Sequence, residues 1–386
     1  MFSLGAQLSV ARGLRGAATV SLAGCALVGL LAALTSIVGS RSRLSTYQLL
    51  AYSFGVRGAR FVNLILGVML IGWFATTGAM LGAAVHDAIR QLFGFTWPDW
   101  LITSIALVLM TLTGIFGFRV MESFARITVP LLLTLMTYVV WLAVHGKTAH
   151  GFAAAGDNSL SAVDALSSVI GAIILTAVLA PDLTRYARTD RDALFSVAGL
   201  AIGFPLALIL AAIPASILNR IDVMAIMAVL GLPGIGVLIL VMSTWTSNTS
   251  NLYSSTLTLA TFFPRISSQS LGAGAAVIAL SAAILGIADH FIPMLIGLGV
   301  VSAPLAGVYV MDFFAIKKQR YDPADLAKAA PVSPSAFVAW AAGASVGLVT
   351  TYSQWSLTKI PAVDSIVAAA LIYFLIKSRP HTDERT

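Results

Sequence analysis

The sequence predicts an all-α integral membrane protein. Of its 386 residues, 58% are hydrophobic and 10% are charged, whereas about a quarter of the residues in an average soluble protein are charged. Apolar stretches of about 17 to 25 residues recur along the whole chain, and each is long enough to cross roughly 30 Å of hydrocarbon. Because the connections between them are short, we expect one transmembrane domain over residues 1–386.

Eleven such stretches are expected to form membrane-spanning helices. In chain order they cover about 17–39, 61–85, 101–118, 127–145, 164–181, 194–217, 224–246, 271–288, 291–313, 334–352 and 361–376. Each is included because its apolar length matches the thickness of a bilayer. The seventh continues as a polar extension to about residue 260, and the longest connections are about 146–163 and 314–333.

Basic residues predict the orientation of these helices. If the stretch 17–39 runs from outside to inside, 17 of the 23 Lys and Arg residues lie on the cytoplasmic side and six lie outside. Cytoplasmic loops of membrane proteins are enriched in Lys and Arg, so this orientation is favoured over its inverse. We therefore expect a multi-pass protein of the cytoplasmic (inner) membrane. Since the basic residues are spread over many loops, nucleic acid is not expected as a partner.

Several functional classes lack their sequence signals. Cys25 is the only cysteine, which excludes disulfides within the chain and cysteine-ligated metal sites. The five histidines are scattered without metal-ligand spacing. We find neither the clustered catalytic groups of an intramembrane enzyme nor the repeated pore segment or charged ring of a channel. Neither an enzyme nor an organic cofactor is expected.

The segment Ser243–Thr256 is unusually polar for a chain of this composition. It reads Ser-Thr-Trp-Thr-Ser-Asn-Thr-Ser-Asn-Leu-Tyr-Ser-Ser-Thr and directly follows the apolar segment 229–242. Lipid cannot satisfy such groups, so they must face protein or a water-filled cavity. Helical spacing gathers these on one broad face: Ser243, Thr246, Ser247, Ser250, Asn251 and Ser254. This face is a candidate binding site; the alternative is that its hydroxyls bond back to their own helix or pack at a helix interface.

The order of the spans suggests two inverted repeats, an arrangement common in secondary transporters. Residues 164–313 hold five spans and form the expected second repeat, residues 17–145 hold four, and residues 334–376 add two. A complete architecture of this type would have five, five and two. We therefore expect the chain to start one helix late, with residues 1–16 as the tail of a helix that lines a cavity. The alternative is a terminal tail on a complete eleven-helix protein.

Five motifs, in order along the chain, resemble a known family. They are Tyr-Ser-Phe-Gly-Val-Arg-Gly-Ala-Arg at 52–60, Gly-Trp-Phe-Ala-Thr-Thr at 72–77, Pro-Asp-Leu-Thr-Arg-Tyr-Ala-Arg at 181–188, Trp-Thr-Ser-Asn-Thr-Ser-Asn-Leu-Tyr at 245–253 and Val-Ser-Ala-Pro-Leu-Ala-Gly-Val-Tyr-Val-Met-Asp-Phe-Phe at 301–314. The set resembles the nucleobase:cation symporter-1 family, also known as the purine-cytosine permease family, and its cytosine permease branch above all.

The resemblance implies a twelve-helix transporter with the five-plus-five inverted repeat. It would import a nucleobase, cytosine or a related purine or pyrimidine, together with Na+ or H+. In such proteins the first and sixth helices are broken, the cation lies between the first and eighth helices, and the substrate lies against the third, sixth and eighth. By this comparison the helix expected to be missing is the first, and residues 1–16 correspond to its outer end.

The resemblance also implies a partial sodium site. Thr246 and Ser247 correspond to hydroxyl ligands, and Ser243 corresponds to a backbone carbonyl ligand one turn earlier. Oxygen ligands of this kind suit a hard cation. The remaining ligands would come from carbonyl groups of the first helix.

Four residues are expected to contact the substrate from the third and eighth helices of the family. Trp73 lies in the middle of a span, where an indole ring can stack on a flat base. Thr77 shares its face one turn later. Asn251 offers both a donor and an acceptor to the edge of a base, and Asn248 is a second candidate, although its rotation around the helix can turn it toward another helix.

The sixth helix departs from the family pattern. Counting back from Pro181, the position where relatives carry a second aromatic residue is Ile173, next to Ala172. Isoleucine covers a ring by dispersion but has no π-face. The substrate could therefore be another small heterocycle, such as allantoin, hydantoin or a thiamine-precursor pyrimidine. A truncated, nonfunctional product is a further alternative.

The acidic residues near helix ends are not expected to contact substrate. Asp182 and Arg185 follow Pro181 at the cytoplasmic end, where charges can reach water, and a structural or gating role is favoured for them. For Glu122, Asp289 and Asp312 a solvated or paired charge at a helix end is favoured over a proton relay.

Overall fold

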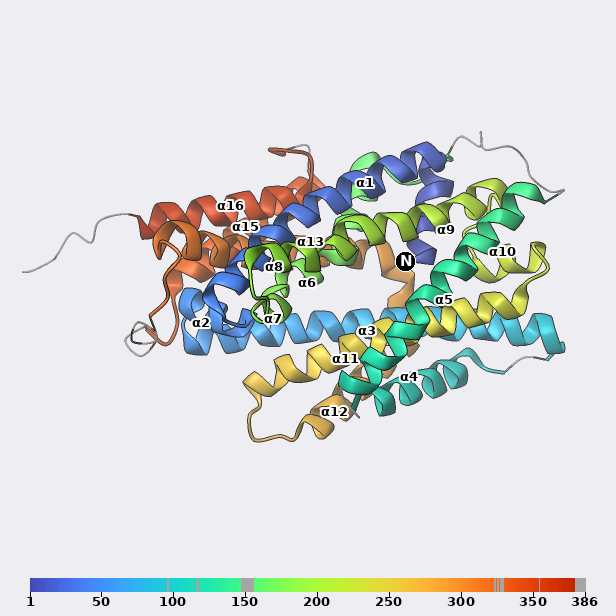
Figure 1. The fold of residues 1–386 in the computed structure, drawn as a ribbon, viewed down its shortest axis with the longest axis horizontal. Coiled ribbons are helices and arrows are strands. Elements are labelled where there is room, and N and C mark those ends of the chain that lie inside the picture. The colour runs from blue at the N-terminus through green and yellow to red at the C-terminus, as the bar shows by residue number, and fades with distance from the viewer. Residues whose placement is uncertain are drawn as a thin grey trace, which may run out of the picture. The chain divides into compact units, whose positions relative to one another are not determined.

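A computed structural model of the chain describes residues 1–95, 97–115, 118–146, 156–322, 324, 326, 330–353 and 355–378. The regular structure within these residues is helical, as the sequence predicts (Figure 1). Seven helices in this part of the chain are long and apolar enough to cross a membrane, and Asp99–Gly114 and Ser268–Ile284 are shorter apolar helices.

The chain divides into two compact units. Unit 1 comprises Met1–Ser21, Asn63–Ala162 and Pro205–Phe291, and unit 2 comprises Leu22–Val62, Val163–Phe204 and Ile292–Thr386. Each unit takes segments from both of the expected repeats, so the units do not follow the order of those repeats along the chain. The division into repeats at 17–145 and 164–313 stays a prediction.

Unit 1 is built around the long polar helix that the sequence predicts. Its elements are the first part of α1 (Phe2–Ser42), most of α3 (Val56–Phe93), α4 (Asp99–Ile115), α5 (Phe118–His145), α9 (Phe204–Leu218), α10 (Val223–Val229), α11 (Pro233–Phe262), α12 (Ser268–Ile284) and the 3-10 turn η2 (Ile287–His290). Helix α11 packs against α4, α5, α10 and α12. Phe74 of α3, Leu107 and Met110 of α4 and Leu252 of α11 are buried in one hydrophobic cluster, so these three helices share a core.

The predicted span 224–246 is wrong as a single helix. Helix α10 ends at Val229, and α11 begins at Pro233. Gly231 lies between them with φ of +72°, a conformation that L side chains rarely adopt. Pro233 then occupies the first turn of α11, where its missing N–H costs nothing. Beyond this break α11 runs without interruption to Phe262, so the polar segment from Ser243 to Thr256 is helical throughout.

The start of the chain is helical. Residues 1–16 are helical from Phe2 onward and belong to α1, which is kinked at Gly13, where φ is 68° and ψ is 166°. Just before the kink, the carbonyls of Val10 and Ala11 accept hydrogen bonds from the Asp157 and Asn158 amides. Residues 1–16 are thus part of the packed structure of unit 1.

Unit 2 contains the remaining helices. They are the rest of α1, α2 (Thr46–Phe54), the start of α3, α6 (Ala162–Val178), α7 (Pro181–Thr184), α8 (Asp190–Ser196), the π-helix η1 (Gly199–Gly203), α13 (Phe291–Met311), the π-helix η3 (Asp312–Ile316), α15 (Pro334–Tyr352) and α16 (Pro361–Lys377). Helices α15 and α16 form a closely packed antiparallel pair (Figure 1). The expected spans 164–181 and 194–217 correspond to Ala162–Thr184 and Asp190–Leu218, which are both long and apolar enough to cross a membrane. A turn separates α6 from α7 at the end of the first, and η1 lies within the second.

Close approach of α6 and α13 depends on a glycine. A Cβ atom added at Gly171 would overlap the carbonyl group of Leu295. No side chain larger than hydrogen fits there without moving a backbone, so Gly171 sets the distance between these two helices of unit 2.

Candidate functional site

Trp73 and Thr77 lie on the same face of α3, one turn apart, and both are partly exposed. The Thr77 hydroxyl is 2.7 Å from the Trp73 carbonyl, a bond back to its own helix. The ring of Trp73 lies against the ring of Phe291, with the ring centroids 6.3 Å apart and the planes tilted by 48°. Phe291 was not singled out by the sequence, because it is one of many aromatic residues in apolar segments and only the tertiary structure brings it to Trp73.

Asn248 connects α11 to its neighbours in unit 1. Its side chain is fully buried. The amide oxygen lies 2.6 Å from the Thr77 hydroxyl, and the amide nitrogen donates to the Phe74 carbonyl at 3.3 Å and lies 3.5 Å from the Met110 sulfur. Both polar atoms of this amide therefore have partners on α3 and α4. A contact between Asn248 and a substrate stays a prediction.

Asn251 has different surroundings. It lies one turn after Ser247 and is partly exposed, and its amide nitrogen is 3.5 Å from the Ser247 hydroxyl, at the long end of hydrogen-bonding distances. Ser247 and Ser250 on the same face are exposed. Asn251 is thus reachable from outside the helix, whereas Asn248 is not.

Of the two hydroxyls expected as sodium ligands, Thr246 donates to the Met242 carbonyl of its own helix at 2.7 Å, and Ser247 lies 3.5 Å from the Asn251 amide nitrogen. Ser243, expected to contribute its backbone carbonyl, donates its hydroxyl to the Leu240 carbonyl at 3.2 Å. A hydroxyl that has given its hydrogen to a carbonyl still carries lone pairs, and these are what a cation needs. The expected cation ligands are neutral oxygen atoms, which fit a hard monovalent ion, and α11 contains no acidic residue. In the described part of the chain, three or more His, Cys, Asp or Glu side chains do not gather into a metal site.

Trp73, Thr77, Asn248 and Asn251 belong to unit 1, where hydrogen bonds join the first three, while Ala172 and Ile173 belong to α6 of unit 2. Ile173 is 4% exposed and Ala172 is partly exposed. A larger side chain at Ile173 would therefore have to displace its neighbours.

Two of the acidic residues near helix ends have buried partners. Asp182 accepts a hydrogen bond from the Thr46 amide at 2.8 Å and so caps the first turn of α2. Asp312 is 2% exposed and accepts hydrogen bonds from the Tyr373 hydroxyl at 2.7 Å and the Tyr321 hydroxyl at 2.8 Å. It is therefore a paired charge and not a solvated one. The side chain of Glu122 lies outside the described residues.

Comparison with known proteins shows which family the chain is similar to over its whole length. Residues 1–373 match the model of a family described as permeases for cytosine/purines, uracil, thiamine and allantoin. The cytosine permease of Escherichia coli (strain K12) is 28% identical in an alignment of length 365 that covers 92% of this chain and 82% of that protein. The hydantoin permease of Microbacterium maritypicum is 25% identical in an alignment of length 334 that covers 79% of this chain and 67% of that protein.

Solved structures with the same fold are also similar over nearly the whole chain. The inward-facing conformation of Mhp1 has a TM-score of 0.81 and 19% identity, covering 97% of this chain and 86% of that one. Mhp1, a nucleobase-cation-symport-1 family transporter, in a closed conformation with bromovinylhydantoin bound, has a TM-score of 0.76 and 21% identity, covering 96% and 87%. A Na+-coupled sialic acid symporter has a TM-score of 0.64 and 15% identity, covering 97% and 89%. The predicted all-α membrane transporter fold is confirmed.

Proposed function

Because the chain belongs to the family of permeases for cytosine/purines, uracil, thiamine and allantoin, we propose that it imports a nucleobase, cytosine or a related purine or pyrimidine, in symport with Na+ or H+. A member of this family is a transporter and not an enzyme. Its several long apolar helices make it a multi-pass membrane protein. The excess of basic residues on one predicted side supports the cytoplasmic membrane, with those residues facing the cytoplasm.

The observation that carries the substrate proposal is the hydrogen bond between Thr77 and Asn248. At 2.6 Å it joins α3 to α11 directly, and it supports a site in which Trp73, one turn before Thr77 on α3, and the polar face of α11 serve one substrate. A flat base can stack on the indole, a contact worth on the order of 1–3 kcal/mol. Asn251 can then pair with the edge of that base, since its amide supplies one donor group and one acceptor.

The proposed cation site lies on the same face of α11. Thr246 and Ser247 contribute hydroxyl oxygens, and Ser243 contributes its backbone carbonyl. The absence of an acidic residue from α11 favours Na+ over H+ for this site, because a proton needs a base to bind. The Na+-coupled sialic acid symporter, which has the same fold, is compatible with sodium.

A second candidate is import of hydantoin or allantoin. The observation in its favour is Ile173, an aliphatic residue where a second aromatic residue is expected, and a hydantoin permease is among the relatives. The two candidate functions differ in the substrate that is imported and agree that the protein is a transporter.

The test is uptake of radiolabelled cytosine by cells that lack their own cytosine permease and express this chain. We expect saturable uptake that unlabelled cytosine abolishes. Among uracil, hypoxanthine, allantoin and hydantoin, we expect a nucleobase to compete best. If hydantoin or allantoin competes better than any nucleobase, the second candidate replaces the first. If expressed, membrane-inserted protein takes up none of these compounds, the proposed function is wrong.

A further inference from the structure

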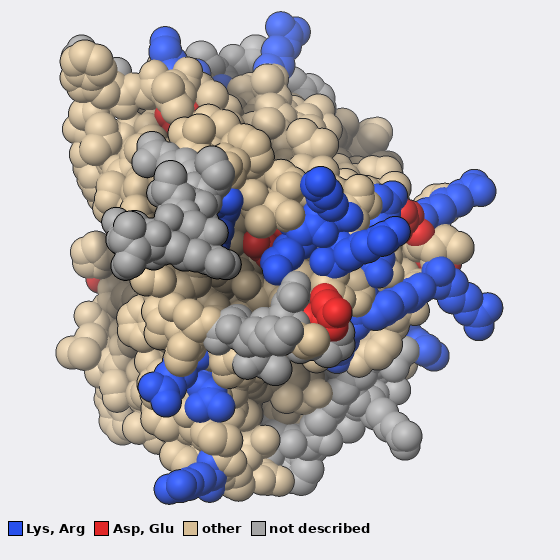
Figure 2. Space-filling view, turned by 90° about the vertical axis from the view of Figure 1, so that its left-hand side faces the viewer, with Lys and Arg blue, Asp and Glu red and all other residues tan. Residues whose placement is uncertain are grey.

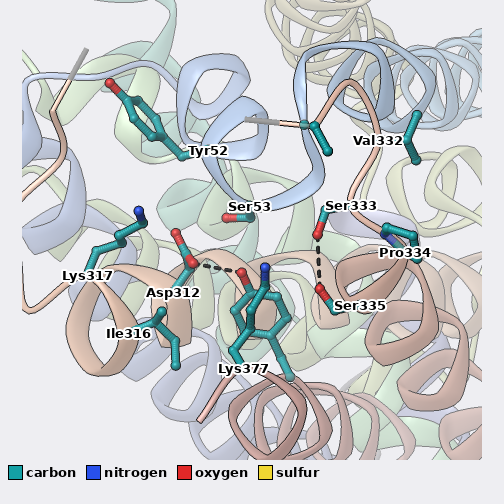
Figure 3. A pocket seen from close by; sticks show the side chains of 13 residues that line it. Tyr52, Ser53, Asp312, Ile316, Lys317, Val332, Ser333, Pro334, Ser335 and Lys377 are labelled. Carbon is teal, nitrogen blue, oxygen red and sulfur yellow. Dashed lines mark hydrogen bonds between the residues drawn. The ribbon is translucent and has the colours of Figure 1, made fainter. Parts of the chain in front are cut away.

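A cavity of about 390 Å³ lies in unit 2, at the end where α2, η3, α15 and α16 meet (Figure 3). Its wall includes two basic side chains, Lys317 after η3 and Lys377 in the last turn of α16, and two hydroxyls, Ser333 and Ser335, at the start of α15. The Ser333 and Ser335 hydroxyl oxygens are 3.0 Å apart. The lining is thus rich in groups that bind anions.

The acidic residue in this wall, Asp312, is hydrogen-bonded to two tyrosines of unit 2. Its two oxygens accept hydrogen bonds from Tyr321 and Tyr373, and the ring of Tyr321 is stacked on Tyr52 at a centroid distance of 4.2 Å. Burial raises the pKa of Tyr321 well above its ordinary value, so the phenol keeps its hydrogen and goes on donating. In Figure 3 Asp312 lies between Lys317 and Lys377. The two lysines outnumber this single carboxylate.

The surface around the cavity is basic. Other cationic side chains of unit 2 on neighbouring segments are exposed, namely Arg57, Arg60, Lys318 and Arg320. Arg41 and Arg320 line a second hollow that shares Tyr52 with the first. Figure 2 shows Lys and Arg side chains crowded on one face with few acidic side chains among them. Such a face attracts anions, and anionic lipid headgroups are abundant at the cytoplasmic surface of membranes.

Exposed apolar side chains immediately precede Lys377 on α16. Phe374, Leu375 and Ile376 are 38%, 58% and 39% exposed. They lie at the end of a predicted membrane span, where a lipid places its acyl chains beneath its phosphate. Phosphate binding by the lysines and apolar contact by the preceding turn are therefore available to one molecule.

We propose that this cavity binds the phosphate headgroup of an anionic phospholipid, with Lys317 and Lys377 as the charged contacts and the hydrogen-bonded pair of Ser333 and Ser335 hydroxyls supplying one further donor. Free inorganic phosphate shares the headgroup chemistry. The exposed turn from Phe374 to Ile376 favours the lipid, because free phosphate gains nothing from an apolar surface. The proposal concerns the fold in its bilayer and does not depend on which substrate is transported.

The experiment measures lipid binding by thermal unfolding of the purified protein in detergent, titrated with phosphatidylglycerol, with phosphatidylcholine of the same acyl chains, or with inorganic phosphate. The double variant Lys317→Gln/Lys377→Gln removes both charges. Arg188→Gln is the matched control, because it removes an exposed charge from unit 2 without touching the cavity. A basic residue near an anionic surface changes affinity by roughly fivefold, so we expect the double variant to bind phosphatidylglycerol about 25-fold more weakly than the wild type.

We expect Arg188→Gln to stay within about twofold of the wild type, and phosphatidylcholine to bind about tenfold more weakly than phosphatidylglycerol. Equal binding of the two lipids, or unchanged binding by the double variant, would overturn the proposal. Binding of inorganic phosphate as tight as that of the lipid would make the site a phosphate site instead. If the double variant does not fold, Lys377→Gln alone and the salt dependence of wild-type binding between about 50 and about 300 mM decide the matter, since a charge contact at the surface must weaken with salt.

Discussion

Two asparagines on α11, three residues apart, have opposite surroundings. Asn248 is buried, and both of its polar atoms have partners on α3 and α4. Asn251 is partly exposed next to Ser247. A buried amide that loses its partners leaves other polar groups unpaired, whereas an exposed amide is replaced by water. We therefore expect Asn248 to stabilise the fold and Asn251 to bind the substrate.

Substitution separates these two roles. Asn248→Ala should lower the free energy of unfolding by about 1–3 kcal/mol, because it removes the buried hydrogen bonds of the amide to the Thr77 hydroxyl and the Phe74 carbonyl. Asn251→Ala should leave stability within about 0.5 kcal/mol and weaken substrate affinity about tenfold through loss of a hydrogen-bonded edge contact. Thermal unfolding and uptake kinetics of the two variants measure this. An Asn251→Ala variant with unchanged kinetics would remove Asn251 from the proposed site.

Trp73 supplies the stacking surface in the proposed site. Trp73→Ala should reduce affinity for the base by about 5- to 150-fold, the equivalent of one lost stacking contact, while the protein still inserts in the membrane. Trp141→Ala is the matched control: it deletes the same side chain at an exposed position of α5. Competition uptake assays and membrane protein yield report on both. The stacking assignment fails if the two variants have the same affinity.

At the scale of elements, helix packing and helix breaks position the residues. The Gly231 turn ends α10 and lets α11 begin afresh at Pro233, so that one uninterrupted helix presents both the candidate cation ligands and Asn251. In unit 2, Gly171 allows α6, which carries Ala172 and Ile173, to reach the backbone of α13. The turn at Gly231 and the close helix contact at Gly171 thus set the positions of the candidate site residues in their units.

The packing of α6 against α13 provides a sharp test. Gly171→Ala should destabilise the protein by about 1–3 kcal/mol, because the new methyl group overlaps the Leu295 carbonyl. Gly297→Ala is the control on α13, where an added Cβ meets no atom within 4 Å; it should be neutral or stabilise by up to about 1 kcal/mol through helix propensity. Thermal unfolding in detergent compares them. Equal midpoints would show that the two helices can separate without cost.

At the scale of the whole molecule, the chemistry is divided between the two units. Unit 1 holds Trp73 and the polar face of α11, and unit 2 holds the basic surface with its cavity. Cation coupling is a property of the complete chain in its membrane, since it links an ion gradient to the movement of a substrate. The neutral oxygens of α11 bear on this property, because they favour Na+ as the coupling ion.

Coupling to sodium predicts a specific loss. Thr246→Ala/Ser247→Ala should remove the stimulation of uptake by Na+, because two hydroxyl ligands disappear from a site with no acidic residue to replace them. Thr134→Ala/Thr137→Ala is the matched control, since these exposed hydroxyls on α5 bond only back toward their own helix. Initial uptake rates in sodium and choline media are compared. Uptake that follows pH and ignores sodium in the wild type would instead identify H+ as the coupling ion.

The membrane fold could be predicted from the sequence because its signals are local. Apolar length, the density of Lys and Arg, and the polar run at 243–256 are all properties of short segments, and the bilayer demands that each segment be helical. The break at Gly231 was also present as a local Gly-Leu-Pro signal, but the apolar run around it outweighed that signal. The resemblance of five motifs then indicated the family, and the comparisons confirm it.

The membrane class, the helical fold, the family and the identity of the polar face of α11 could therefore be read from the sequence. Which of those residues are buried, and what they contact, became known only from the packing of the helices. Thr77 and Asn248 are 171 residues apart, and Asp312 and Tyr373 are 61 apart, so no periodicity could pair them. Helical spacing places a side chain on a face, but the free energy of a buried polar group depends on the neighbour that covers that face, and the neighbour comes from another part of the chain.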